Sequence, residues 1–518
     1  MSAAKAKKES ENNWKLAGSS WAGAWKVFAG MGVLGLVGAG VGYASDPRRF
    51  AFSWLFAFVT VLTVALGALF FVLIQHLTSA GWSVTVRRTA EFFALGLVAL
   101  VPLFVPVLAS MNHLFPWLGH HSHESGHASG PARHSTLDLP FVKPAYAQGA
   151  EGHGGGAAAA EQPEKTQQPE KTPNPSLAPT HGEPAPAHPS DPAGALPGAK
   201  GGPPSDSPQP DVHGDTAHGA HVAHAAHGPM GDPHELTERK MLEKKAPYLN
   251  QTFFLVRVGI YFVVWVLLAV RLFGYSTAQD KSKDKKLTLA MQRFAPPATF
   301  LYALTLTFAA FDWIMSLEPT WFSTIFGVII FACGVVSSLA VIILVTLSLR
   351  ASGPLKGAVT IEHYHDLGKL MFGFLVFWAY VQFSQFMLIW YAALPEETTF
   401  YHNRWDYAPW DKVSQALVLF HFVVPFFWVI SRNFKRNVGR LQIGAAIILV
   451  MHVVDMYWFV MPNYLLGQPG FSFHWVDAAC LLAVAGIYGA FVFNRMTQHA
   501  LVPVGDPRLE RSLQFMNA

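Results

Sequence analysis

Cysteine is scarce in this sequence. The 518-residue chain has two cysteines, Cys333 and Cys480, each inside an apolar run, and it contains no Cys-x-x-Cys-His motif. A disulfide framework, a zinc site and a thiolate-held iron–sulfur cluster each need more cysteines than two. Any redox cofactor would therefore have to be held by histidine alone or by another subunit, and we assign no catalytic, cofactor-binding or metal-ligating residue in this chain.

Charged residues are scarce as well. They make up 14% of the chain, whereas 51% of the residues are hydrophobic, and the net charge is +4. Soluble domains carry about 25% charged residues. The apolar residues form runs of about 18 to 28, long enough to cross a bilayer core as helices. This composition predicts an all-α polytopic membrane protein in contact with lipid. No basic stripe with interleaved aromatics is present, which argues against a nucleic-acid partner.

The apolar runs predict about ten transmembrane helices. Their expected ranges are 25–44, 51–77, 90–111, 252–273, 294–317, 321–349, 367–391, 413–431, 438–461 and 474–494. Residues 1–24 precede the first helix and form a cytoplasmic segment. The expected divisions after it are 25–115 (helices 1–3), 116–247, 248–320 (helices 4–5), 321–461 (helices 6–9) and 462–518 (helix 10 and a cytoplasmic tail).

Basic residues indicate the orientation of the helices. The N-terminal segment is basic but is followed by polar residues, so it does not resemble a cleavable signal. Lysine and arginine concentrate in the connections on the same side of the predicted membrane as the N-terminus, for example at Arg87 and Arg88 after the second helix, at Lys281–Lys286 and at Arg432–Arg440. They are sparse in the opposite connections apart from Arg48 and Arg49. The positive-inside rule then predicts that both termini are cytoplasmic.

Residues 116–247 differ from the rest of the chain. They are rich in Pro, Gly and Ala, lack apolar periodicity and hold 14 of the 23 histidines. Such a composition cannot bury enough surface to fold, so we expect a disordered tether on the periplasmic side. A metal-binding role of its histidines is the alternative.

Two pairs of short motifs indicate an internal repeat. Phe52-Ser53-x-x-Phe56-Ala57 matches Phe322-Ser323-x-x-Phe326-Gly327 with an offset of 270 residues. Asp312 and Asp455 each precede a proline by seven residues, with an offset of 143. The offsets differ by 127, close to the length of the predicted tether. Helices 2–5 and 6–9 are therefore expected to form two parallel four-helix bundles, flanked by helices 1 and 10.

Ionisable residues inside the predicted helices are the candidate functional residues, because they are costly in a membrane and usually serve a pathway. Arg257, Asp312 and Asp455 are expected roughly 8–10 Å inside the outer surface. His421 and His452 are expected roughly 13 Å inside it, on neighbouring helices. His452 and Asp455 share a helical face, where the carboxylate can orient the imidazole. Asp477 begins the tenth helix on the same side.

A second set of ionisable residues lies near the inner surface. Its members, at the ends of the second, third and seventh helices, are His76, Glu91, His365, Asp366 and Lys369. Asp366 and Lys369 have the spacing of an ion pair along one helix. The inner and outer sets together predict the two halves of a proton path.

Each of these assignments has a structural alternative. Arg257 and Asp312 can form an ion pair that only fixes packing, and Glu91, Asp366 and Lys369 can lie among the lipid headgroups. His421 and His452 also fit a bis-histidine haem by depth. Tryptophans near helix ends are expected to form interfacial belts; they are Trp313, Trp321, Trp405, Trp410 and Trp475.

Two long segments carry a family resemblance. FDWIMSLEPTWFSTIFG (311–327) and HDLGKLMFGFLVFWAYVQFSQFMLIWYAALPEET (365–398) resemble the F subunit of bacterial alternative complex III, of the polysulfide-reductase-like (NrfD-type) membrane family. The resemblance covers all ten helices and leaves out the tether. It implies two four-helix bundles with flanking helices, in the inner membrane of a bacterium.

The resemblance also implies a respiratory role. In that family a complex oxidises quinol and passes electrons to cytochrome c or to an oxidase. The implied partners are a quinol-binding sister membrane subunit, an iron–sulfur subunit, c-type cytochrome subunits and a cytochrome oxidase. The iron–sulfur centres and haem c belong to those partners, and the F subunit supplies scaffold and a proton path. Whether the subunit is itself an enzyme stays open.

Three other functions remain open at this point. This chain can itself bind quinol near His421, His452 and Asp455, where a His–carboxylate pair would accept protons. It can be a secondary transporter, because parallel repeats and midplane charges are also transporter features. It can also be a pure scaffold.

Overall fold

The computed structural model describes residues 14–118, 233–465 and 473–516. Among these residues, ten helices are long and apolar enough to cross a membrane, which confirms the all-α polytopic fold. The spanning segments are Ser20–Ser45, Pro47–Leu77, Val84–Ala109, Gln251–Ser282, Lys285–Leu317, Phe326–Ala351, Ile361–Ala392, Trp410–Val429, Val438–Leu465 and Trp475–Gln498.

Several of the spanning segments are composed of shorter helices. The first six helices in chain order are α2 (Ala24–Ser45), α3 (Pro47–Leu77), α4 (Val84–Leu95), α5 (Leu97–Leu103), α6 (Val105–Ala109) and α7 (Met111–Leu114). Next come α8 (Pro233–Lys245), α9 (Gln251–Ser282), α10 (Lys285–Trp313), α11 (Phe326–Ala351), α12 (Ile361–Ala392) and α13 (Pro395–Trp405). The rest are α14 (Trp410–Ala416), η5 (Leu417–Val423), α15 (Val424–Val429), α16 (Arg432–Arg436), α17 (Val438–Val460), α18 (Trp475–Gln498) and α19 (Leu509–Leu513). Pro102 and Pro106 each remove a backbone donor, which accounts for the break between α5 and α6 at Phe104. The break between α4 and α5 falls at Gly96.

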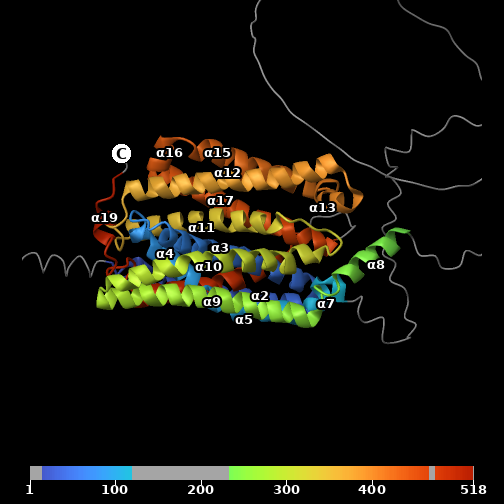
Figure 1. Ribbon diagram of the computed structural model, residues 1–518, viewed down its shortest axis with the longest axis horizontal. Coiled ribbons are helices and arrows are strands. Elements are labelled where there is room, and N and C mark those ends of the chain that lie inside the picture. Colours follow the sequence, from blue (N-terminus) through green and yellow to red (C-terminus); the bar gives the residue numbers. More distant parts are fainter. Residues whose placement is uncertain (1–13, 119–232, 466–472, 517–518) are drawn as a thin grey trace, which may run out of the picture. The chain divides into compact units, whose positions relative to one another are not determined.

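The axes of the spanning helices are nearly aligned with one another, so that the helices lie side by side (Figure 1). At one end, here called the tail end, lie α19 and the C-terminus; α7, α8 and α13 lie at the other, here called the loop end (Figure 1). Leu501 N donates to Trp14 O at 2.9 Å, so the described parts nearest the two termini meet at the tail end.

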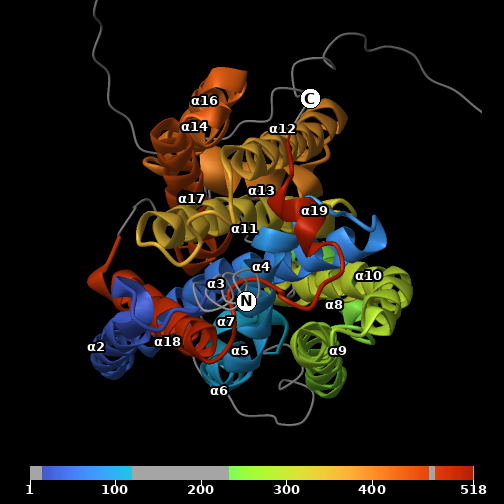
Figure 2. The same ribbon diagram turned by 90° about the vertical axis from the view of Figure 1, so that its left-hand side faces the viewer.

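Helix packing confirms the two predicted four-helix bundles. In the first bundle α3 packs against α4, α4 and α5 against α9, α9 against α10, and α10 against α3. In the second, α11 packs against α12, α12 against α15, α15 and η5 against α17, and α17 against α11. The order of neighbours is the same in both. The paired helices α2 and α18 flank the bundles and pack against α3 (Figure 2).

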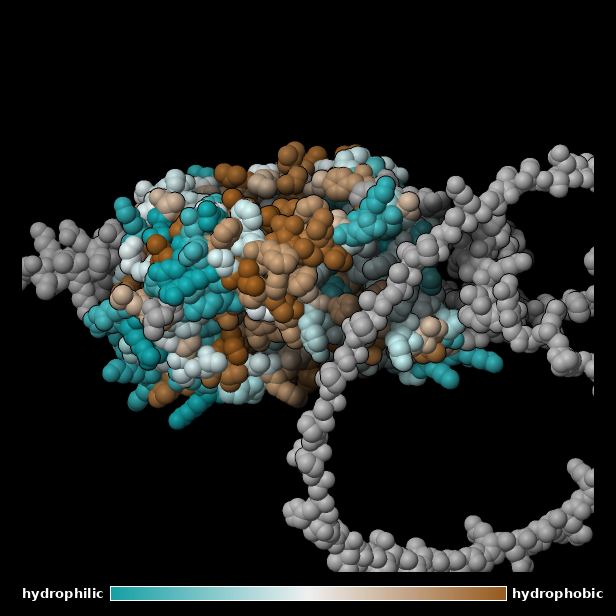
Figure 3. Space-filling model, turned by 90° about the horizontal axis from the view of Figure 1, so that it is seen from above, coloured by the Kyte–Doolittle hydropathy of each residue, from teal (hydrophilic) through white to brown (hydrophobic). Residues whose placement is uncertain are grey.

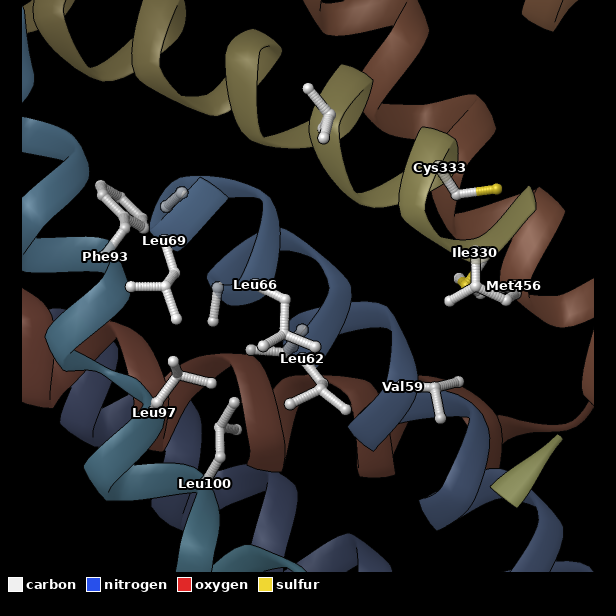
Figure 4. Close-up of a cluster of buried hydrophobic side chains, with 14 of the residues drawn as sticks. Val59, Leu62, Leu66, Leu69, Phe93, Leu97, Leu100, Ile330, Cys333 and Met456 are labelled. Atoms are coloured by element: carbon white, nitrogen blue, oxygen red, sulfur yellow. The ribbon is translucent and has the colours of Figure 1, made fainter. Parts of the chain in front are cut away.

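The two bundles meet along α3 and α11. Figure 4 shows the first bundle's side of this core, where Leu62 and Leu66 of α3 lie toward Leu97 and Leu100 of α5. The second bundle contributes Ile330 from α11 and Met456 from α17. Gly67 and Gly334 allow the closest approach, because a Cβ added to Gly67 would lie 2.0 Å from Gly334 O. Two glycines therefore set the separation of the bundles.

Apolar side chains also cover the outer surface. A hydrophobic band crosses the middle of the face drawn in Figure 3, between more hydrophilic ends. Exposed apolar residues of this kind occur on α2, α9, α10 and α12, for example Val33, Val263, Phe300 and Phe383. Such a band is the surface expected against lipid.

Helices at both edges of residues 116–247 shorten the segment that was predicted to be disordered. Residues 119–232, with most of the histidines, lie outside the described residues, so the prediction of disorder and its metal alternative are untested there. At its edges the boundary is wrong, because Pro116–Leu118 and Pro233–Lys245 are helical. The strong helix formers in ELTERKMLEKK explain the second helix. Lys245 Nζ donates to Pro319 O at 2.6 Å and attaches α8 to the loop end.

Candidate functional site

Arg257 and Asp312 form a buried ion pair in the first bundle, near the loop end. Arg257 Nε and Nη2 lie 2.7 and 2.9 Å from the two carboxylate oxygens, and the Tyr261 hydroxyl donates to Oδ2 at 2.7 Å. Arg257 Nη1 also donates to Tyr248 O at 2.9 Å. An arginine does not lose its proton in proteins, so the charge of Asp312 is permanently compensated. The predicted Arg257–Asp312 ion pair is thereby confirmed.

Asp455 occupies the matching place in the second bundle, with different partners. Its Oδ2 accepts from Trp378 Nε1 at 3.0 Å and from Cys333 Sγ at 3.2 Å. Its Oδ1 is buried and has no hydrogen-bond partner within the described residues. The nearest basic group is His421, whose Nδ1 lies 3.8 Å from Oδ2. Asp455 is fully buried, and its compensating group is a histidine that can gain or lose a proton.

His452 lies one helical turn before Asp455 on α17, and its contacts define its neutral tautomer. Nε2 lies 3.0 Å from Thr63 Oγ1 and 3.3 Å from Thr60 O. The Thr63 hydroxyl donates to Val59 O at 2.8 Å, so toward the ring it can only accept. A carbonyl also only accepts, so the hydrogen is on Nε2. Nδ1 is then the nitrogen that can take up a proton, and it has no hydrogen-bond partner in the described structure.

His421 completes the group formed by Asp455 and His452. Its ring packs against the Trp378 ring, with centroids 4.1 Å apart, and neither ring nitrogen has a hydrogen-bond partner among the described residues. Each of the two imidazoles therefore keeps at least one nitrogen without a hydrogen-bond partner among the described residues, and the bis-histidine haem alternative stays a prediction. We call Asp455, His421 and His452 the second-bundle group.

A π-helix carries His421. Residues Leu417–Val423 form it inside the eighth span, and Pro425 follows two residues after its end. A π-turn inserts one residue into the helix, which rotates the residues beyond it, and such turns are frequent at functional sites. The sequence analysis missed this distortion, for which Pro425 is the one available signal.

Asp477 is locked in the same way as Asp312. Arg49 Nε donates to Asp477 Oδ1 at 3.2 Å, and the Tyr457 hydroxyl donates to Oδ2 at 3.1 Å. The Ser53 hydroxyl is a further donor to Oδ1. The sequence analysis counted Arg49 among the loop charges and so did not find this pair, which joins α3 to α17 and α18.

Arg87 and Arg88 are the centre of a buried ionic cluster at the tail end. Arg87 lies 3.0 Å from Glu91 and 2.8 Å from Asp506, and Arg88 lies 3.0 Å from Glu91 and 2.8 Å from Asp280. Both arginines are 0% exposed. Their prediction as loop charges is therefore wrong, as is the start of the third span at 90. Helix α4 begins at Val84 because acidic partners allow both arginines to be buried.

The alternative prediction that Glu91 lies among the lipid headgroups is also wrong, because its side chain is buried and the residue is 2% exposed. His76 lies fully buried at the same end, and neither of its ring nitrogens has a hydrogen-bond partner in the described chain. The other inner residues lie apart from this cluster. Asp366 and Lys369 pair at 2.6 Å at the start of α12, where the lysine is half-exposed, and His365 is buried beside them. The predicted Asp366–Lys369 pair is thus confirmed.

The C-terminal segment, residues 499–516, supplies part of the tail-end cluster. Burial would raise the pKa of Asp506, but Arg87 and Arg508 outweigh it and lower the pKa below its ordinary value. Ser512 Oγ donates to Trp82 O at 2.6 Å and lies 3.3 Å from His363 Nε2. Asp506 could not be identified from the sequence because it lies in an irregular segment, 419 residues along the chain from Arg87, which it contacts.

The predicted tryptophan belts are only partly present. Trp405 and Trp475 are exposed, as an interfacial position requires. Trp313, Trp321 and Trp410 are instead buried, because each lies on an inward face and packs against other rings, Trp321 on Phe400 with centroids 4.1 Å apart.

A small cavity of about 20 Å³ lies where the two bundles meet, lined by Thr63, Trp265, Trp313 and apolar side chains of α3, α10 and α11. Ligand sites for drug-sized molecules have volumes of roughly 300–1,000 Å³, so a quinone ring does not fit this cavity. Across the described ranges, no three His, Cys, Asp or Glu side chains are grouped as ligands for a metal ion.

Comparisons of the whole chain with known protein families and with curated proteins find no match.

Proposed function

We propose that this chain is an integral membrane subunit of a quinol:cytochrome c or quinol:oxidase oxidoreductase, in which it acts as scaffold and carries protons through its second bundle. The resemblance of residues 311–327 and 365–398 to the F subunit of alternative complex III supports the complex. The observation that carries the proton role is the second-bundle group, a buried carboxyl with two histidines and no permanent counter-charge.

The chemistry of that group fits proton transfer. Asp455 Oδ1 and His452 Nδ1 are both buried and both lack a hydrogen-bond partner among the described residues. A carboxylate oxygen and a bare imidazole nitrogen are each able to accept one proton. Asp312 and Asp477 are held by arginines instead, so we assign them to the scaffold.

A partial line of polar groups leads from this site toward the tail end. Thr63 contacts His452 and lies against Gly334. Ser338 lies beside Gly67 on the far side of that crossing, with a buried hydroxyl that lacks a hydrogen-bond partner in the described part. His76 lies farther along α3, and the tail-end cluster lies at the same end, on α4, α9 and the C-terminal segment. The proposal assigns these groups to the inner half of the path.

In this proposal the quinol site and the redox centres belong to partners. A sister membrane subunit would bind quinol, while an iron–sulfur subunit and c-type cytochrome subunits would hold the iron–sulfur centres and haem c. The bacterial inner membrane, with both termini cytoplasmic, is the proposed location.

The first experiment is affinity purification of the tagged full-length chain from native membranes in a mild detergent. Companion c-type cytochromes and an iron–sulfur subunit, identified by haem absorbance and mass spectrometry, are the expected result. Isolation of the chain alone, without haem absorbance, would overturn the respiratory proposal and favour a secondary transporter, which uptake of labelled solutes into vesicles would then test.

A second experiment separates proton path from scaffold. Asp455→Asn in the reconstituted complex is expected to lower the number of protons translocated per electron. The matched control is Asp406→Asn, because Asp406 is an exposed carboxylate at the loop end that contacts only His402 in the described structure. An unchanged proton stoichiometry in the Asp455 variant would contradict the proton role, and a scaffold would then be the remaining function.

A further inference from the structure

Helices α9 and α10 lie side by side at one edge of the described bundle (Figure 2). Both helices carry exposed apolar side chains. On α9 the exposed large apolar residues extend from Phe253 to Val270, a rise of about 26 Å. On α10 they extend from Phe300 to Phe308, after two exposed prolines, and Leu289 is a single further one nearer the start of the helix. The length on α9 corresponds to most of a bilayer core of roughly 30 Å, so the apolar surface ends at headgroup level.

Two exposed arginines lie at that level, Arg271 on α9 and Arg293 on α10. The Arg271 guanidinium lies 5.4 Å from the Tyr275 ring centroid and 5.0 Å from that of Phe294, the neighbour of Arg293. The ring contacts hold the guanidinium in place while its N–H edges stay available. Neither arginine has an acidic partner among the residues described.

The acidic residues nearest in sequence are already engaged. Asp280 pairs with Arg88 at 2.8 Å and accepts from Gly505 N at 3.1 Å. Asp284 caps α10 by accepting from Lys286 N at 2.8 Å. Exposed lysines at the turn between α9 and α10 add positive charge beyond the two arginines; they are Lys281, Lys283, Lys285 and Lys286. The outer face therefore presents uncompensated positive charge directly beside an apolar surface.

We propose that Arg271 and Arg293 bind the phosphate of an anionic phospholipid whose acyl chains lie along the apolar faces of α9 and α10. An arginine fork binds phosphate through two parallel hydrogen bonds, and the adjacent apolar surface accommodates the acyl chains. A negatively charged lipid is favoured over a zwitterionic one because the site holds at least two positive charges and no free acid. The inference does not depend on the proposed respiratory role.

The test uses the full-length chain, with any subunits that co-purify, in nanodiscs of phosphatidylcholine with increasing phosphatidylglycerol. Native mass spectrometry then counts the lipids that stay bound. The wild type is expected to retain phosphatidylglycerol selectively. A basic residue near the membrane surface contributes about fivefold in affinity, so the double variant Arg271→Gln/Arg293→Gln is expected to lose roughly 25-fold.

The matched control is Arg432→Gln, because Arg432 is exposed in the second bundle and has no ring contact of the kind that holds Arg271 in the described structure. It is expected to bind phosphatidylglycerol as the wild type does. Equal retention by the double variant and the wild type, or equal retention of phosphatidylcholine, would overturn the proposal.

A second measurement excludes loss of folding and free phosphate. In lipid-free detergent the double variant is expected to unfold at the wild-type temperature, while added phosphatidylglycerol raises the midpoint of the wild type alone. The same rise in the variant would contradict the assignment. So would an equal rise of the wild type with inorganic phosphate, which would show that no lipid is needed.

Discussion

Asp312 and Asp455 occupy equivalent places in the two bundles but have opposite electrostatic surroundings. Arg257 gives Asp312 a permanent counter-charge, whereas the basic group that the described structure places within 4 Å of the Asp455 carboxylate is the imidazole of His421. A buried charge without a partner is costly, so the two carboxyls have different consequences when they are changed.

Asp312→Asn is expected to destabilise the protein, because it leaves Arg257 buried without its counter-charge. Removal of one partner of a buried pair costs about 3 kcal/mol. The measurement is the thermal unfolding midpoint of the purified protein. The double variant Arg257→Met/Asp312→Leu should recover most of the loss; a double variant as unstable as the single would contradict this explanation.

Sequence reasoning succeeded where both members of a pair lie within helices at predictable depths. Arg257 with Asp312 and Asp366 with Lys369 are of this kind. It failed where one partner lies outside the regular helices, as for Arg87 with Asp506. The donors to Asp455 were also missed, because Cys333 and Trp378 come from other helices and only packing brings them to the same oxygen.

At the scale of elements, the C-terminal segment behaves as a strap across the tail end. Asp506, Ser512 and Phe515 contact α4, the Trp82 turn and α12. The sequence predicted only a cytoplasmic tail here, since α19 has five residues and no apolar periodicity strong enough to indicate docking. The segment docks against buried groups because the two buried arginines of α4, Arg87 and Arg88, bind Asp506 and the Ala500 carbonyl oxygen.

Asp506→Asn is expected to loosen this strap at neutral pH by about 2 kcal/mol, because an ionised acceptor of charged hydrogen bonds is lost. Hydrogen exchange of residues 499–516, followed by mass spectrometry, measures the change. Exchange in residues 326–351 should stay unchanged and serves as the internal control.

The pH dependence of the strap follows from the lowered pKa of Asp506. A carboxyl with a lowered pKa in the folded state stabilises fully above its unfolded pKa of about 3.9, and the effect is lost as the pH falls through the folded pKa. Intrinsic-rate-corrected protection of residues 499–516 is therefore expected to be constant from pH 8 to about pH 5 and to decrease only below about pH 4. A decrease near pH 6 would show that another group controls docking.

At the scale of the whole described bundle, the repeat predicted from two short motifs is present as two rings of helices with the same order of neighbours. Motif offsets were sufficient because duplication of a four-helix unit preserves spacing along the chain. The contact between the bundles was not predictable, since Gly67 and Gly334 have no sequence feature that distinguishes them from the other helical glycines.

Gly67→Ala is expected to destabilise the protein by about 3 kcal/mol, as overpacking does when the neighbour is backbone. The new Cβ would lie 2.0 Å from Gly334 O. Gly274→Ala is the matched control, because nothing lies within 4 Å of its added Cβ, and it should be neutral or stabilising by up to about 1 kcal/mol. Equal thermal unfolding midpoints of the two variants would contradict the inference that the contact between Gly67 and Gly334 sets the separation of the bundles.

Orientation can be tested with introduced cysteines, because both native cysteines are buried. Lys283→Cys at the tail end and Glu397→Cys at the loop end are expected to react with a membrane-impermeant maleimide from opposite sides. In intact cells with a permeabilised outer membrane, the proposed topology predicts labelling of the loop-end cysteine alone. Labelling of the tail-end cysteine instead would reverse the topology.

The contact of Asp506 with Arg87 also has a consequence for biosynthesis. The arginine is inserted with the third span, whereas its second acidic partner follows the tenth span along the chain. Until then Arg87 must rely on Glu91 and on water. The tail end can therefore close only after all ten spans have been made, and a translation product that stops before Asp506 would leave this cluster open to quality-control proteases.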